Sequence, residues 1–161
     1  MNIDNKQLCN YILDLLSKLH SDYLLINRIC YKVKHQFRRH RHFQYITQYK
    51  NILKKTFRPI TITSKSSSPP TNTNDNIFSS ILTSQYFTKH YITNTIIPLL
   101  IKIGLLLNEM MKLKLYLPYC VVMLGIVSRA HSIYEYVLNN NDVILSSANA
   151  LNLCKINSNN I

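Results

Sequence analysis

The sequence predicts an all-α protein, an antiparallel helical bundle of about four main helices. The first observation is that glycine is scarce: the 161 residues contain only Gly104 and Gly125, whereas a sheet protein of this size needs more glycines in its turns. The second is a long run of apolar residues at alternating intervals of three and four, the spacing of a helix that packs along one side. The third is a pair of long apolar stretches in the second half of the chain.

The length and the apolar content of 47% suit one domain with its own core. Composition divides the chain into four segments. We expect a basic helical pair over 1–58, a flexible linker over 59–76, an apolar helical pair over 77–142 that completes the same bundle, and a weakly ordered tail over 143–161. The linker is predicted to be disordered because Ser, Thr, Asn and Pro dominate it.

The first helix is predicted to begin near Asn5, since Asp4 and Gln7 resemble a capping box. Its apolar seam comprises Cys9, Ile12, Leu16, Leu19, Tyr23, Ile26, Cys30, Val33 and Phe37. We expect a bend over 38–42 and then a shorter helix from Phe43 to Phe57. Pro59 ends that helix, because the residue before a proline disfavours the helical region.

The second half is predicted to form two helices, at about 85–115 and about 118–138. Pro98 is expected to kink the first of them, and Pro118 suits the first turn of the second. We expect the seam of the first helix to face Ile97, Leu100, Ile103, Leu107, Val121, Leu124 and Val127. The uncharged apolar stretches of these two helices, 115–128 and 90–101, are shorter than the roughly 20 residues of a membrane span, which favours buried bundle helices.

Positive charge is concentrated in one third of the chain. No Asp or Glu lies between Asp22 and Asp75, and the whole chain has a formal charge of +12. Ten of the nineteen Lys and Arg residues lie between residues 23 and 58: Arg28, Lys32, Lys34, Arg38, Arg39, Arg41, Lys50, Lys54, Lys55 and Arg58. A field of one sign this dense attracts a polyanion.

The basic residues also follow the helical period. Arg28, Lys32, His35 and Arg39 are spaced i, i+4, i+7 and i+11, which places them in a stripe away from the seam. Neighbouring Asn27 and Gln36 can form hydrogen bonds with bases or phosphates, and Tyr31 offers a ring for stacking. The candidate RNA-binding residues are therefore Asn27, Arg28, Tyr31, Lys32, Lys34, His35, Gln36, Arg38, Arg39, Arg41, Lys50, Lys54, Lys55 and Arg58.

Two other interpretations of the basic face stay open. It can be an ordinary solvated surface, although like charges without acidic neighbours repel and cost stability. It can also meet anionic lipid, as the basic helix of a membrane-associated interaction protein.

The sequence offers no candidate catalytic site, metal site or cofactor site. The seven acidic residues are far apart, the four cysteines form no CxxC pair, and no glycine-rich phosphate loop is present. His35, His40 and His42 could act as acid and base in RNA cleavage, but we favour the interpretation that they extend the basic face. Unpaired cysteines and a polar N-terminal start without a signal peptide predict a reducing, intracellular setting.

The block from Leu24 to Arg38 resembles the signature of the nucleolus and neural progenitor protein family, which includes the fungal RNA-binding protein subunit of RNase MRP. The matching positions are Arg28, Tyr31, Lys32, Lys34, Gln36 and Arg38, and Phe43, Leu53, Lys54 and Lys55 continue the match. The chain departs from the pattern where His35 replaces a common Asn and Phe37 a common His.

The resemblance implies a helical bundle that binds structured RNA, the RNase MRP RNA, beside other protein subunits of the same ribonucleoprotein. It also implies a role in pre-ribosomal RNA processing in the nucleus, at the nucleolus. The RNA would carry the catalysis, so this subunit is predicted not to be an enzyme and to bind neither a membrane nor a small-molecule substrate.

Overall fold

The computed structural model describes residues 3–58 and 88–140, and this part of the chain is helical with no strand. The all-α prediction is confirmed. The helices are α1 (Ile3–Phe37), α2 (Arg41–Thr56), α5 (Lys89–Tyr91), η2 (Ile92–Ile96), α6 (Ile97–Lys112) and α7 (Leu117–Asn139). The predicted linker over 59–76 and the predicted tail over 143–161 lie outside the described residues.

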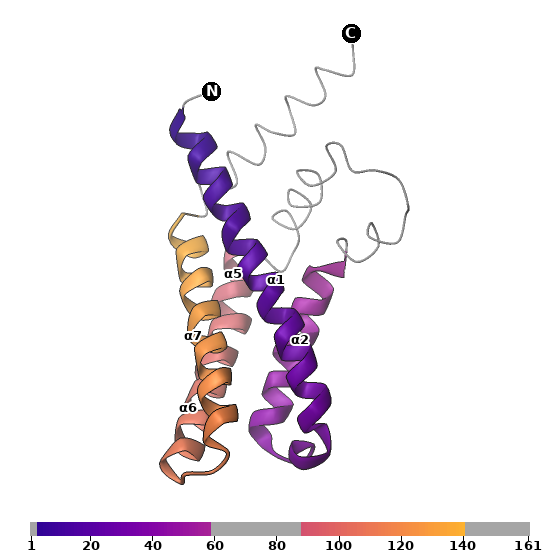
Figure 1. The fold of residues 1–161 in the computed structure, drawn as a ribbon. Coiled ribbons are helices and arrows are strands. Elements are labelled where there is room, and N and C mark those ends of the chain that lie inside the picture. The colour runs from indigo at the N-terminus through magenta and orange to yellow at the C-terminus, as the bar shows by residue number, and fades with distance from the viewer. Residues whose placement is uncertain (1–2, 59–87, 141–161) are drawn as a thin grey trace, which may run out of the picture.

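The helices form an antiparallel bundle in which each long helix packs against two others. The chain runs down α1, up α2, down α5, η2 and α6, and up α7 (Figure 1). α1 contacts α2, α2 contacts α6, α6 contacts α7, and α7 returns to α1. The α1–α2 pair and the α6–α7 pair therefore share one core.

From Ile12 to Phe37 the predicted seam of α1 faces this core, and the side chain of Cys9 lies outside the described residues. Ile12, Leu16, Leu19, Ile26, Cys30 and Phe37 are buried, while Tyr23 and Val33 lie half-buried at its edge. α1 begins at Ile3, two residues before the predicted start. Burying one such aliphatic side chain contributes about 1.5–3 kcal/mol, so the seam supplies much of the bundle's stability.

The helical turn that precedes Pro98 is wider than an α-helical turn. Residues 92–96 form a π-helical turn, in which the amide of Ile97 donates to the carbonyl of Ile92. Pro98 has no N–H for an α-helical bond to Asn94, and its ring clashes with that carbonyl in the α register. The wider turn relieves the clash, and the helix then continues to Lys112.

The turn between α6 and α7 is tight and left-handed. Lys114 and Tyr116 have φ of 56° and 50°, a region that costs L-residues energy unless contacts hold them there. The ring of Tyr116 packs edge-on against Phe37 with centroids 4.7 Å apart. This contact ties the α6–α7 turn to the end of α1.

The predicted core on α6 and α7 is right for most positions and wrong for one. Leu100, Ile103, Leu107 and Val127 are buried, and Ile97 and Leu124 are half-buried at the edge of the core. Val121 is 55% exposed. The face of α7 that enters the bundle instead carries Cys120, Met123, Ile126, Val127, Ala130, Ile133, Tyr134 and Val137.

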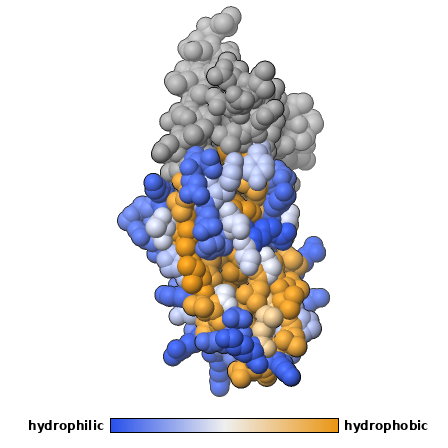
Figure 2. Space-filling view, turned by 90° about the vertical axis from the view of Figure 1, so that its left-hand side faces the viewer, coloured by the Kyte–Doolittle hydropathy of each residue, from blue (hydrophilic) through white to orange (hydrophobic). Residues whose placement is uncertain are grey.

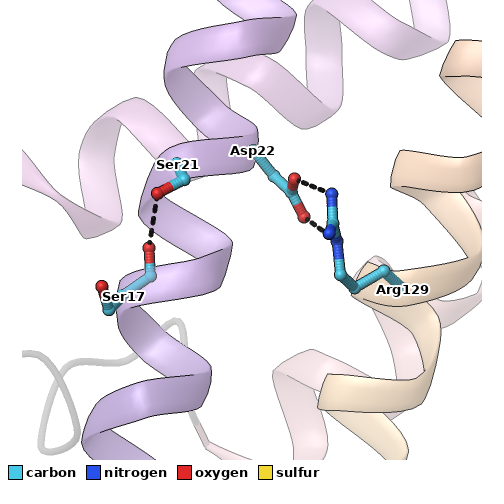
Figure 3. A network of polar contacts seen from close by, with 4 residues as sticks. All are labelled: Ser17, Ser21, Asp22 and Arg129. Carbon is cyan, nitrogen blue, oxygen red and sulfur yellow. Dashed lines mark hydrogen bonds and ion pairs between the residues drawn. The ribbon is translucent and has the colours of Figure 1, made fainter.

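An ion pair joins α1 to α7 inside this packing. The guanidinium of Arg129 donates to both carboxylate oxygens of Asp22, with Nε 2.9 Å from Oδ2 and Nη2 2.5 Å from Oδ1 (Figure 3). Asp22 is 3% exposed and occupies a position on the buried side of α1. Burial raises the pKa of Asp22, although the hydrogen bonds and charge of Arg129 oppose this.

The α6–α7 pair exposes an apolar face. Its residues are Ile101, Leu105, Leu113, Leu115, Tyr116, Leu117, Val121 and Val122, each at least 42% exposed. Apolar side chains cover much of the lower half of the side of the molecule shown in Figure 2. Within the described residues, the stretch Lys89–Lys112 is long and apolar enough to cross a membrane by length and composition, and 33% of its most apolar window is buried.

Candidate nucleic-acid interface

The ten basic residues predicted to bind RNA lie at the surface of α1, α2 and the ends of those helices. Nine are exposed and Lys50 is half-buried. They occur on two antiparallel helices that pack side by side. The structure therefore gathers them on one helical pair, which we call the basic surface.

On α1 the basic surface lies opposite the buried seam. Arg28, Tyr31, Lys32 and His35 are spaced i, i+3, i+4 and i+7, so they share one helical face, and all four are exposed. Tyr31 is 83% exposed, which is the largest value among the exposed hydrophobic side chains. A bare tyrosine ring between two cations can stack on a base while the cations hold the adjacent phosphates.

The flank of α1 that faces α2 carries Asn27 and Lys34, both exposed. Burial raises the pKa of the Cys30 thiol, and the positive charge of Lys50 on α2 opposes this rise. Lys54 follows one turn after Lys50 on the same side of α2. Lysines from both helices thus border the α1–α2 boundary.

The turn between α1 and α2 adds the densest group of charges. Arg38, Arg39 and Arg41 are all exposed there. The turn is closed by a hydrogen bond of 2.9 Å from the amide of His40 to the carbonyl of Phe37. Guanidinium groups bind phosphate oxygens in a bidentate manner, so this end of the molecule suits a closely spaced pair of phosphates.

The remaining predicted residues are also accessible. Gln36 lies near the end of α1, Lys55 lies in the last turn of α2, and Arg58 follows that helix. All three are exposed. Gln36 can donate and accept hydrogen bonds, which suits sugar and base edges.

Three carboxylates among the described side chains have contacts away from the basic surface. Asp14 lies 2.7 Å from Lys18, Asp22 binds Arg129, and Glu135 lies 3.6 Å from His131. Lys18, Arg129 and His131 are not among the ten basic residues, so these three contacts involve no side chain of the basic surface.

The structure corrects the interpretation of one histidine. His42 was expected to extend the basic face, but it is 4% exposed and packs against Phe37 and Tyr119, with ring centroids 5.1 and 5.9 Å away. Burial, assisted by the neighbouring His40, lowers the pKa of His42 to about 4. It is therefore a neutral core residue at pH 7, whereas His35 and His40 are exposed.

Sequence reasoning missed two features that depend on packing. One is the pair of Asp22 and Arg129, which lie 107 positions apart. The other is a groove between α2 and the helix formed by η2 and α6, lined in part by Gln48 and Asn94. The i, i+3 spacing of Tyr45 and Gln48 indicates that both lie on one face of α2. It does not indicate which helix packs beside that face.

No group of three or more His, Cys, Asp or Glu side chains among the described residues is placed to hold a metal ion. Comparison of the chain with protein-family models, with curated proteins and with solved structures finds no match in any of the three. None of the three comparisons bears on the resemblance to the nucleolus and neural progenitor protein family.

Proposed function

We propose that the protein is a non-catalytic RNA-binding subunit of a ribonucleoprotein and that the basic surface of α1 and α2 holds RNA phosphates. The observation that carries this proposal is the arrangement of ten cations on one helical pair, while Asp14, Asp22 and Glu135 contact Lys18, Arg129 and His131. Phosphate contacts of this kind dominate affinity for nucleic acid. Exposed Tyr31, Asn27 and Gln36 would adjust the local fit.

The resemblance of the Leu24–Arg38 block supports a finer proposal. The RNA would be that of RNase MRP, and the protein would act in pre-ribosomal RNA processing at the nucleolus. The apolar face of α6 and α7 supports assembly with other protein subunits, because exposed apolar patches often mark protein–protein contacts.

The test is the salt dependence of RNA affinity. Each phosphate contact adds about 0.7–0.9 to the slope of log affinity against log salt. The variant Arg38→Gln/Arg39→Gln should bind a structured RNA more weakly, and its slope should fall by about two contacts. Neither arginine belongs to the buried seam, so the variant should stay folded, with a melting temperature no lower than that of the wild type.

A matched control separates local contact from net charge. The variant Lys18→Gln/Lys112→Gln also removes two positive charges, but from exposed positions outside the basic surface. It should keep the wild-type slope. Equal slopes and affinities for the wild type and Arg38→Gln/Arg39→Gln would mean that the basic surface is only solvated, and the proposal would fail.

A second candidate is membrane association, which the composition of Lys89–Lys112 and the apolar face favour. Against it, Leu100, Ile103 and Leu107 are buried in the bundle, so a spanning helix would have to leave its packing partners. Co-sedimentation with vesicles of anionic lipid separates the two candidates. Binding to vesicles that persists at high salt would favour the membrane, whereas RNA binding without vesicle binding would favour the ribonucleoprotein.

A further inference from the structure

A groove of about 420 Å³ lies between α2 and the helical stretch formed by α5, η2 and α6. Nine residues line it: Tyr45, Gln48, Ile52, Tyr91, Asn94, Thr95, Pro98, Leu99 and Lys102. Those from α2 are spaced i, i+3 and i+7, and those from the other stretch follow the same helical period. The groove is thus a valley between two helix faces, of a size that suits a nucleotide.

The lining has an apolar floor and a polar rim. Ile52 and Leu99 are buried, Tyr45 and Tyr91 present half-buried rings, and Gln48, Asn94 and Lys102 are exposed. No carboxylate is among the nine lining residues. Aromatic rings beside amide groups suit a nucleobase, which has two apolar faces and hydrogen-bonding edges.

The π turn shapes one wall of this groove. Asn94 lies within the turn, and its Nδ2 donates to a ring nitrogen of His90 at 3.0 Å. This bond orients the amide of Asn94, and π turns are found frequently at functional sites.

Along α2, one basic residue precedes the groove and another follows it. Arg41, Gln48 and Lys55 are seven residues apart and share one side of the helix. Seven residues correspond to about 10 Å of helix, so each cation lies within a side chain's reach of a nucleotide seated at Gln48. Both cations are exposed and belong to the basic surface.

We propose that this groove binds one unpaired base of an RNA strand while Arg41 and Lys55 hold the phosphates on either side. Tyr45 and Tyr91 supply stacking surfaces, Gln48 and Asn94 contact the edge of the base, and Lys102 contacts the backbone. This inference rests on the proposed RNA binding and adds a preference for single-stranded segments to it.

The test compares two RNA probes on the full chain: a hairpin with an unpaired loop and a duplex of equal phosphate number. The variant Gln48→Ala/Asn94→Ala removes two exposed amides from the groove. It should bind the looped probe about tenfold more weakly, since two hydrogen bonds are each worth about 0.5–1.5 kcal/mol. It should bind the duplex with wild-type affinity and wild-type salt dependence.

The control variant Asn51→Ala/Asn108→Ala removes exposed amides of α2 and α6 outside the groove, and it should bind both probes as the wild type does. Photo-cross-linking with 4-thiouridine in the loop should label Tyr45 or Tyr91. Equal affinity of wild type and Gln48→Ala/Asn94→Ala for the looped probe would overturn the groove site alone. If the wild type binds neither probe in a salt-dependent manner, the proposed RNA binding itself is wrong.

Discussion

Asp22 is a buried carboxylate that depends on a partner from a distant part of the chain. Arg129 on α7 donates two hydrogen bonds to it (Figure 3). Because 51% of the Arg129 side chain is exposed, the pair is partly solvated and adds less than a fully buried one. The main effect of Arg129 is to neutralise the negative charge of Asp22, which α1 places in the core.

Removing the cation should therefore be costly. We expect Arg129→Met to lower the free energy of unfolding by about 2–3 kcal/mol, because Asp22 is left buried without its cation. Denaturation by urea measures this effect. The control Arg28→Met changes an exposed arginine of α1 and should stay within about 0.5 kcal/mol of the wild type. A loss for Arg129→Met as small as that of the control would contradict this account.

His42 should make stability depend on pH. Its pKa is about 4 in the folded protein and about 6.5 in the unfolded chain, so the unfolded chain binds the proton more tightly. The resulting stability is fully present above pH 6.5 and is lost as the pH falls towards 4. Between pH 7.5 and 5 we expect a loss of about 2 kcal/mol in the free energy of unfolding.

The control for this prediction is His42→Phe, which keeps an aromatic ring in the same place. Its pH dependence should be smaller than that of the wild type, and burial of His20, which lowers the pKa of His20 as well, accounts for part of what is left. An equal loss in wild type and His42→Phe would show that His42 is accessible to water.

At the scale of one helix, the two sides of α1 should respond differently to the same truncation. Leu19→Ala or Ile26→Ala removes a fully buried side chain and should lower the free energy of unfolding by about 2–5 kcal/mol. Leu24→Ala removes the same atoms from the exposed side and should change it by less than about 0.5 kcal/mol. Thermal unfolding of the three variants checks this, and similar melting temperatures would contradict the observed packing.

The sequence predicts α1 well because its buried and exposed residues differ in chemistry. The spacing from Ile12 to Phe37 identified the correct face, and the basic residues identified the opposite one. α7 is apolar on several sides, so its sequence could not show which side enters the bundle, and Val121 was placed wrongly. His42 was misjudged for a related reason: a histidine among arginines looks solvated until the neighbouring helix is in place.

One part of the candidate site could be predicted from the sequence, and another part could not. The charges of the basic surface are a property of two neighbouring helices, so composition and spacing were enough to predict them. The groove beside Gln48 needs the contact between α2 and α6, whose residues lie dozens of positions apart. Its existence could not be read from either segment.

For the whole molecule, the unbalanced charge should make folding sensitive to salt. Ten cations on one helical pair repel each other, and salt at 0.1 M screens charges beyond about 10 Å. Raising the salt concentration from low to physiological should therefore increase the melting temperature by a few degrees. The increase should be smaller in Arg38→Gln/Arg39→Gln. A lower melting temperature at higher salt would mean that attractive ion pairs outweigh this repulsion.

The basic surface and the apolar face belong to different helical pairs, so the molecule is electrically polar as a whole. The electric field of a polyanion rotates such a molecule as well as attracting it. If the polyanion is the proposed RNA, α1 and α2 would turn towards it before contact. Orientation during approach raises the fraction of productive collisions, an advantage that salt removes. The protein would also arrive with the exposed side of α6 and α7 pointing outwards. On the function proposed above, RNA binding would come first and would leave this apolar face accessible to a protein partner.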